Sequence, residues 1–350
     1  MRGALFFRAH IDPRLSSRSL TNWSSISISN FPTRAPRHRH LSSSASSSVL
    51  QKADPSSNNM PRLNKTSQEA INRLRAYQPP PTSYDQVHVS RRAAVLLLLY
   101  ADVKGDLRVV LTIRASTLSS YAGQAALPGG KSDSPSETPI QTSRREAHEE
   151  IGLPAVDSDL PPPFSVEHLC EIPCSLARTE LVVRPCVALL HSFDEKTGEN
   201  ADPETTLIPR LDAREVAAVF TAGFRDFLTL TPPVGRDREG VNEEWYKGVW
   251  TEWWETQWRM HQFFVPKPNN TVSKPKPHGA AQEEAVHKLQ EQEESGQVTH
   301  YRVFGMTARI LVDAARIAYN MEPEFEHNRH TGDEDLIRRL RGVGRLGAKI

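Results

Sequence analysis

This 350-residue sequence has few cysteines, no long apolar run and almost no net charge. Three cysteines fit neither a zinc-binding pattern nor a complete disulfide framework, so we expect reduced, buried thiols at Cys170, Cys174 and Cys186. The longest apolar run, Ala93–Ala101, has the length of a strand and falls far short of the roughly 20 residues that span a bilayer. A formal net charge of +1 gives no general reason to expect nucleic acid or a membrane surface as a partner.

The two ends of the sequence differ in composition from its middle. Residues 1–50 contain seven arginines, thirteen serines and one acidic residue, which resembles a mitochondrial presequence, although a disordered basic tail without a targeting role has the same composition. The last three residues, Ala348-Lys349-Ile350, resemble a variant of the Ser-Lys-Leu peroxisomal address. These signals conflict, so the sequence predicts a location in either the mitochondrial matrix or the peroxisome.

Composition divides the chain into five segments. Residues 1–65 are polar and Ser-rich and are predicted to be a disordered tail, whereas residues 66–265 carry the apolar patterning of a globular domain. From 266 to 299, Lys, Pro, Gln, Glu and Asn dominate, which predicts a disordered insertion. We expect residues 300–320 to return to the domain as a strand and a helix, and residues 321–350 to form a tail.

Apolar runs within the globular segment predict mainly strands. Ala93–Ala101 is apolar on both faces, as in a central strand, and the turn after it predicts a hairpin with Leu107–Arg114. Pro185 indicates that its strand lies at a sheet edge or carries a bulge. Further strands are expected at 166–172, 180–190, as a pair within 243–265, and just before Thr307; helices are expected from Thr66, at 212–224, and from Thr307, with both threonines as caps.

The segment after a glycine pair is the most clearly specified helix in the sequence. Thr138 is a favourable N-cap, Pro139 suits the first helical position, and Gln141 completes a capping box. Gly152 suits the left-handed residue that ends a helix. One apolar stripe repeats at the helical period and predicts attachment to a core; its members are Ile140, Ala147 and Ile151.

Three glutamates, Glu146, Glu149 and Glu150, share a neighbouring arc of this helix. Like charges one turn apart destabilise a helix by about 0.2–0.5 kcal/mol per pair, so their grouping needs a reason. Clustered carboxylates supply the oxygen ligands that Mg²⁺ or Mn²⁺ prefers, and such ions commonly share their coordination with substrate phosphates. The alternative is a solvated acidic face neutralised by nearby arginines. The preceding turn, Gly129–Gly130, favours a metal site, with Glu146 and Glu150 as its first ligands.

The spacing of these residues resembles the Nudix box. That motif places a glycine, a short loop and a glutamate ahead of seven residues and an Arg-Glu-apolar-x-Glu-Glu-x-Gly-apolar run; the matching residues are Gly130, Glu137, Arg145, Glu146, Ala147, Glu149, Glu150, Gly152 and Leu153. Six residues rather than five separate Gly130 from Glu137, and this extension resembles the coenzyme A diphosphatase branch of the Nudix family. The resemblance implies an α/β fold, an α/β/α sandwich around a mixed sheet.

A second stretch, Leu111–Gly130, resembles the signature of the same branch. It begins Leu-Thr-x-Arg and continues through Gly123 and Gln124 into Pro-Gly-Gly. Two positions depart from the pattern, because Tyr121 stands where many members have His and Leu127 where many have Phe.

The resemblance implies hydrolysis of the pyrophosphate bond of coenzyme A and acyl-coenzyme A, with 3′,5′-ADP and 4′-phosphopantetheine as products. Mg²⁺ or Mn²⁺ would be held by Glu146, Glu149 and Glu150, with a carbonyl of Gly129–Gly130 as a further ligand. Arg145 is expected to orient the glutamates.

Arg114 and Gln124 are predicted to recognise coenzyme A, and Gly129 and Gly130 are predicted to bind substrate by permitting its close approach to the backbone. A guanidinium binds phosphate in bidentate geometry, so Arg114 would hold the 3′-phosphate that separates coenzyme A from ADP-ribose; otherwise it is a solvated strand end. Glu180 and Glu215 are candidate general bases, with surface carboxylates as the favoured interpretation. The tryptophans of the paired strands either stack on adenine or pack the sheet, and packing is favoured; His261 beside them is expected to be structural.

Two other functions remain open. A Nudix hydrolase acting on ADP-ribose, NADH or another nucleoside diphosphate derivative would keep the same helix. A non-catalytic binding module would be expected to lose glutamates that are present here. No basic aromatic groove supports a nucleic-acid partner outside the N-terminal tail, and the sequence does not indicate an oligomeric state.

Overall fold

The computed structural model describes residues 63–114, 124–194, 196–208, 216–231, 245–267, 276–296 and 298–347. All of them belong to one unit that spans residues 54–350. The predicted N-terminal tail up to residue 62, the candidate base Glu215, and the C-terminal tripeptide lie outside the described residues.

Along the described chain, runs of consecutive strands are separated by helices. The helices are α1 (Lys65–Ala76), α2 (Pro139–Ile151), α3 (Pro203–Thr206), α4 (Ala280–Glu294), α5 (Gly305–Tyr319) and α6 (Glu334–Gly342). The strands are β1 (Arg92–Ala101), β2 (Leu107–Arg114), β3 (Gln124–Ala126), β4 (Gly129–Lys131), β5 (Ser165–Glu171), β6 (Ser175–Leu176), β7 (Val182–His191), β8 (Phe193–Asp194), β9 (Glu199–Asn200), β10 (Val216–Gly223), β11 (Tyr246–Trp253), β12 (Thr256–Pro266) and β13 (His300–Phe304).

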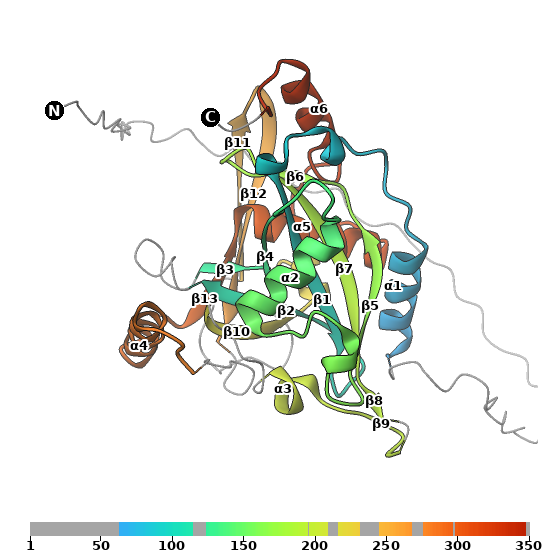
Figure 1. The fold of residues 1–350 in the computed structure, drawn as a ribbon, viewed down its shortest axis with the longest axis vertical. Coiled ribbons are helices and arrows are strands. Elements are labelled where there is room, and N and C mark those ends of the chain that lie inside the picture. Colours follow the sequence, from blue (N-terminus) through green and yellow to red (C-terminus); the bar gives the residue numbers. More distant parts are fainter. Residues whose placement is uncertain are drawn as a thin grey trace, which may run out of the picture. The chain divides into compact units, whose positions relative to one another are not determined.

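β1 lies at the centre of a mixed sheet (Figure 1). It pairs antiparallel with β2, where Leu99 lies opposite Val109, and parallel with β7. β4 pairs antiparallel with the first half of β1, so that Gly130 lies opposite Ala94. The predicted hairpin and the predicted central strand are therefore both confirmed.

β2 extends the sheet in the other direction. β10 pairs antiparallel along its length, and β3 pairs with its end, where Ile113 lies opposite Ala125. β13 pairs parallel with β3, and β12 and β11 follow as an antiparallel pair. This pair confirms the two tryptophan-rich strands expected from the sequence.

Helices cover both faces of the sheet. On one face, side chains such as Leu97 and Val109 pack with α1 and α5. On the other face, their sequence neighbours Leu96 and Val110 pack against α2 (Figure 1). The alternation of side chains along each strand separates these two cores, and the predicted α/β/α sandwich is confirmed.

The helix predicted at 212–224 is wrong, because residues 216–223 form β10. Val219 joins the core on the α2 side and Phe220 joins the opposite core. When a segment is apolar on both sides, its hydrophobic pattern does not distinguish a helix from a strand. The tertiary surroundings then decide which secondary structure forms.

Of the two alternatives predicted from Pro185, the edge position is wrong, because β7 lies between β1 and β5, whereas the β5–β7 pairing does carry an irregularity, between His168 and Cys170 of β5. Pro185 stands where the partner strand is interrupted. Cys186 pairs with Glu171 of β5, whereas Val183 pairs with Ser175 of β6. A residue without an N–H is tolerated inside a sheet where the ladder is broken.

The segment predicted to be a disordered insertion contains the helix α4. Ala285 and Leu289 are buried on its inner side, and Gln282 Nε2 donates to the Val216 carbonyl at 3.0 Å. Ala, Glu, Gln and Leu all favour helices, and the polar composition reflects one solvated face rather than disorder. Residues 268–275 of this segment lie outside the described residues.

The described part of the predicted C-terminal tail, residues 321–347, also packs on the domain. α6 buries one apolar side in a cluster with Tyr84 and Cys174; the helix contributes Leu336, Ile337 and Leu340. The many charges around these residues hid the stripe in the sequence. The prediction of a tail is therefore wrong for this segment.

Two buried carboxylates attach the start of α6 to the sheet. Asp333 accepts a hydrogen bond from the Leu176 amide at 2.9 Å and pairs with Arg309 Nη1 at 2.7 Å. Glu334 accepts from the Cys174 amide at 3.0 Å. Buried charges are stable only when they are paired and hydrogen-bonded in this way.

Neither threonine predicted as a helix cap has that role. Asn64 rather than Thr66 caps α1, and its side chain accepts from the Ser67 amide at 2.9 Å. α5 follows β13 directly with Phe304 at its N-cap position, so Thr307 lies inside the first turn.

The three cysteines are free and buried, as the sequence predicted. Burial raises the pKa of Cys170 and of Cys174 to about 12. Among the residues described above, no helix is both long and apolar enough to cross a membrane.

Replacing Ile337 by Ala tests the attachment of α6. The side chain is fully buried, so its truncation is expected to lower the free energy of unfolding by about 2–4 kcal/mol. The matched control is Arg338→Ala on the exposed side of the same helix, which should change stability by less than about 0.5 kcal/mol. Denaturant unfolding measures both, and equal stabilities of the two variants would mean that α6 is not attached.

Candidate active site

The helix α2 forms as its sequence predicts. Thr138 and Gln141 make the reciprocal capping box, in which the Thr138 amide donates to Gln141 Oε1 at 2.9 Å. Gly152 ends the helix with φ 73°, in the left-handed region. Ala147 and Ile151 are fully buried against the sheet, which sets the rotation of the helix and therefore the direction of its glutamates.

The glycine pair of β4 permits a close approach on two sides. A Cβ on Gly129, whose φ is 153°, would lie 2.3 Å from the Ala94 carbonyl oxygen of β1. A Cβ on Gly130 would lie 2.4 Å from Glu146 Oε1. Glycine is thus required at position 129 by the backbone of the sheet, and at position 130 it allows a predicted site carboxylate to approach closely.

Glu150 is the most enclosed of the three helix glutamates, with a side chain that is 1% exposed. Its Oε2 accepts a hydrogen bond from the Gly129 amide at 2.9 Å. Its Oε1 pairs with the guanidinium of Arg114 at the end of β2. A residue predicted to bind metal and a residue predicted to bind substrate are therefore in direct contact.

Arg145 connects the remaining carboxylates. Its Nη1 lies 3.1 Å from both Glu146 Oε1 and Glu149 Oε2. Its Nη2 donates to the Lys131 carbonyl at 2.8 Å, which ties the helix to the loop after the glycine pair. These contacts fit the predicted orienting role of Arg145.

Glu137 pairs with Arg145 from the other side, Oε1 to Nε at 2.9 Å. Burial opposes ionisation of Glu137, but hydrogen bonds from Arg145 and from the Asp133 amide lower the pKa of its carboxyl below the usual range. The same contact raises the pKa of Arg145 further. The extra residue between Gly130 and Glu137 therefore leaves this ion pair intact.

Asp133, which the sequence did not indicate, also faces Arg145, Oδ2 to Nε at 3.4 Å.

Carboxylates are the ligands that a divalent cation prefers, and three of them lie on one side of α2 beside the glycine turn, where the Gly129 amide contacts Glu150. In this structure Arg114 and Arg145 supply the neutralising positive charge. In the described part of the chain, the one group of three ligand atoms within 4.8 Å of one another is instead His168, Glu171 and Cys186. Glu171 there accepts from Arg184 Nε at 2.8 Å, and burial raises the pKa of the Cys186 thiol, so that group is poorly suited to a cation.

Gln124, the second predicted substrate residue, starts β3 and lies beside Arg302 of β13. The pairing of Ile113 with Ala125 places Gln124 next to Arg114 on the neighbouring strand. Glu180 is not brought to the cluster as a base. Its carboxylate lies 3.1 Å from Arg91 Nη1 and 2.7 Å from Arg345 Nε.

The packing role favoured for the tryptophans holds for only part of them, because Trp250 and Trp254 are exposed. Trp245 and Trp258 are buried, and Trp245 contacts Phe263 with ring centroids 5.6 Å apart. His261 is buried beside Tyr246, and burial together with nearby arginines lowers its pKa to about 3. His261 is therefore neutral and structural.

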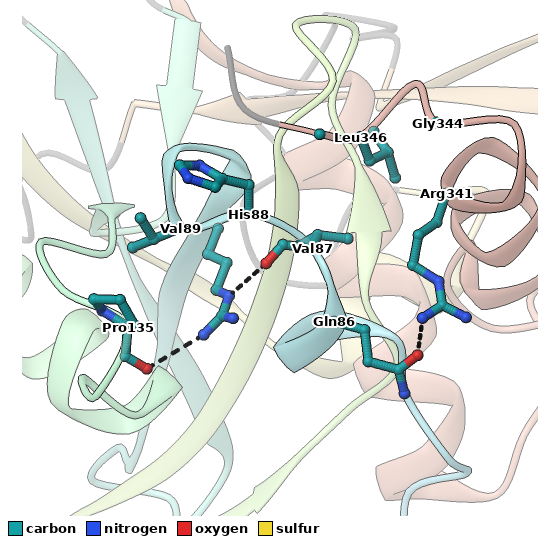
Figure 2. A pocket seen from close by; sticks show the side chains of 10 residues that line it. Gln86, Val87, His88, Val89, Pro135, Arg341, Gly344 and Leu346 are labelled. Atoms are coloured by element: carbon teal, nitrogen blue, oxygen red, sulfur yellow. Dashed lines mark hydrogen bonds between the residues drawn. The ribbon is translucent and has the colours of Figure 1, made fainter.

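A separate pocket of about 510 Å³ lies between the start of β1, the loop before α2 and the segment after α6 (Figure 2). Its polar side chains are engaged by its own walls. Arg92 donates to the carbonyls of Val87 and Pro135, and Arg341 donates to Gln86. None of the predicted site residues lines it.

Comparison with known proteins identifies the family. Residues 90–223 match the NUDIX domain, which includes β4 and α2. The chain is 30% identical over 296 residues to "Peroxisomal coenzyme A diphosphatase 1, peroxisomal" of Saccharomyces cerevisiae, covering 80% of this chain and 85% of that protein. The chain belongs to the Nudix hydrolase family.

Two further Nudix relatives are less similar. "Nudix hydrolase 15, mitochondrial" of Arabidopsis thaliana is 29% identical over 235 residues, covering 67% of this chain and 61% of that protein. The crystal structure of a Nudix hydrolase from M. smegmatis, RenU, is 26% identical, covering 39% of this chain and 72% of that chain with a TM-score of 0.24. The Nudix assignment makes the chain a pyrophosphohydrolase.

Replacing Gly130 by Ala tests the placement of Glu146. The new methyl group meets the end of a flexible side chain, so the carboxylate moves while the strand stays in place. We expect thermal stability close to that of the wild type and Mn²⁺ affinity, measured by electron paramagnetic resonance, reduced by about tenfold or more.

The control for this variant is Gly279→Ala, where an added Cβ meets nothing within 4 Å. Unchanged Mn²⁺ affinity in the Gly130 variant would remove Glu146 from the metal site.

Proposed function

We propose that this Nudix hydrolase cleaves the pyrophosphate bond of coenzyme A and its acyl derivatives, releasing 3′,5′-ADP and 4′-phosphopantetheine or its acyl form. The observation that carries the proposal is the similarity to the yeast protein named as a coenzyme A diphosphatase, which extends over 85% of that protein. The stretch Leu111–Gly130 supports it, since its Arg114 lies against Glu150 of the Nudix helix.

Bound Mg²⁺ or Mn²⁺ would supply charge neutralisation of the phosphate oxygens and activation of water for hydrolysis. Glu146, Glu149 and Glu150 would hold the ion, with a carbonyl of Gly129–Gly130 as a further ligand. The carboxylates gather on one side of α2 under the control of Arg145, which supports this assignment.

The protein's own residues would position the substrate and the carboxylates. Arg145, tied to Glu137 and to the Lys131 carbonyl, keeps Glu146 and Glu149 close together. The Gly129 amide fixes Glu150. Arg114 is 37% exposed and lies beside that carboxylate, so its guanidinium is placed to contact the diphosphate as well.

Hydrolysis rates on a set of substrates test the proposed function. With Mg²⁺ or Mn²⁺ present, we expect kcat/KM on coenzyme A or an acyl-coenzyme A to exceed that on ADP-ribose and NADH by about tenfold or more, because a pocket that pairs with a group rejects analogues that lack it. Faster turnover of ADP-ribose or NADH than of any coenzyme A species would overturn the substrate assignment and favour one of the other Nudix activities.

Replacing Glu150 by Gln tests the catalytic role of the helix. Gln retains an oxygen that accepts from the Gly129 amide, so the fold should survive, but the lost charge is expected to lower kcat by about 100-fold or more. The control is Glu69→Gln on the exposed side of α1, which removes the same charge on the opposite face of the sheet from α2. Full activity of the Glu150 variant would exclude the assigned metal site and is the outcome expected of a non-catalytic module.

We infer that the protein acts in the peroxisome or in the mitochondrial matrix, and its relatives include proteins named for each compartment. Fluorescent fusions at either end, with and without the last three residues, would separate the two. Peroxisomal label that is lost with Ala348–Ile350 identifies the first, whereas mitochondrial label that needs residues 1–50 identifies the second. A label confined to the cytosol in every fusion would contradict the inference.

A further inference from the structure

The face of the sheet that carries the Nudix helix continues beyond it across three strands. Arg114 of β2 lies next to Gln124 of β3, and Gln124 is paired in register with Arg302 of β13. Side chains that are directly opposite in neighbouring strands point to the same face. Arg302 therefore lies on the active-site side, two strand spacings or roughly 10 Å from Arg114.

β12, which pairs with β13 in the sheet, supplies further side chains to this face. Phe264 lies opposite Arg302, and Gln262 lies opposite Phe304. These four side chains are partly exposed, whereas the alternating residues Tyr301, Val303, Phe263 and Val265 are buried on the other face. β12 and β13 therefore share a partly exposed surface that combines aromatic rings with a guanidinium.

Arg302 has hydrogen-bonding capacity that the described structure does not use. Its Nη2 donates to Gln262 Oε1 at 2.8 Å, and its guanidinium carbon lies 4.3 Å from the centroid of the Phe304 ring. Its Nε is buried without a hydrogen-bond partner, so only the terminal nitrogens of the guanidinium can reach a ligand, and within the described ranges no carboxylate forms an ion pair with Arg302. A guanidinium stacked on a ring and not neutralised by an acid is well suited to bind a phosphate.

Arg114 has a different environment. Its guanidinium pairs with Glu150, in the carboxylate cluster itself. It is therefore placed for the diphosphate rather than for a second phosphate on the same substrate. The sequence prediction that Arg114 holds the 3′-phosphate is better transferred to a residue farther along the face.

We propose that Arg302 binds the 3′-phosphate of the substrate, while the rings of Phe264 and Phe304 flank the attached nucleoside. This inference rests on the proposed coenzyme A diphosphatase activity and identifies the residue that distinguishes a 3′-phosphorylated substrate. Arg302 lies beyond residues 90–223, which match the NUDIX domain, so the family motif does not include it.

Comparison of coenzyme A with dephospho-coenzyme A tests the proposal, because the two differ only in the 3′-phosphate. The wild type should prefer coenzyme A. Arg302→Gln is expected to lower kcat/KM on coenzyme A by about 10- to 100-fold, mainly through KM, and to change kcat/KM on dephospho-coenzyme A by less than about twofold. Arg338→Gln on the exposed side of α6 is the control and should leave both values unchanged.

Product inhibition gives a second test, which compares two inhibitors rather than two substrates. 3′,5′-ADP should inhibit the wild type more strongly than 5′-ADP does, and Arg302→Gln should remove this difference. Arg302→Lys keeps the charge but not the planar fork, so it is expected to retain part of the preference. If the Arg302→Gln variant does not fold, the Arg302→Lys variant still tests the proposal.

The outcomes separate this inference from the function on which it rests. An equal loss on both substrates, no loss on coenzyme A, or a wild type that does not distinguish the two substrates would each overturn the role of Arg302 and leave the proposed function standing. Failure of the wild type to hydrolyse either substrate would overturn the proposed function, and the inference with it.

Discussion

The repulsion among three carboxylates on one side of α2 is the constraint on which the site depends. Glu146 and Glu149 share one guanidinium nitrogen of Arg145, and Glu150 is held between Arg114 and the Gly129 amide. The Glu150 contact needs the β4 turn to lie directly against the helix, and glycine at positions 129 and 130 allows this close approach. The capped, core-anchored helix tolerates this charge because its stability comes from Ala147 and Ile151 against the sheet rather than from its exposed face.

The sheet continues the face of the carboxylate cluster well beyond the Nudix motif. β2 ends at the carboxylate cluster, and β3, β13 and β12 continue the same face away from it (Figure 1). The cluster is dominated by paired charges, whereas the extension carries Arg302 on an aromatic ring with no acid partner among the described residues. The two arginines therefore differ in environment, because Arg114 is paired with a carboxylate whereas Arg302 is stacked on a ring and bonded to Gln262.

The parts that sequence reasoning missed share a physical cause. β10 is buried on both faces, so its apolar pattern has no period. α4 and α6 each bury a narrow stripe, Leu289 in one and Ile337 in the other, among many charged residues, and composition averaged over such a segment resembles disorder. Asp333 and Glu334 look like solvated acids in the sequence, but they are buried against backbone amides that come from residues far away in the chain.

The sequence by itself determined the elements whose signals are local: the capping box and glycine stop of α2, the hairpin of β1 and β2, and the grouping of the glutamates on one helical arc. Local signals suffice there because caps, turns and helical spacing act over a few residues. Only the tertiary structure decided which carboxylate faces which arginine, that Glu180 is held by Arg91 and Arg345, and that Arg302 shares a face with Arg114. Those relations depend on strand order and register. Strand order brings together residues as far apart in the chain as Arg114 and Arg302, and no local sequence pattern around either residue indicates the pairing.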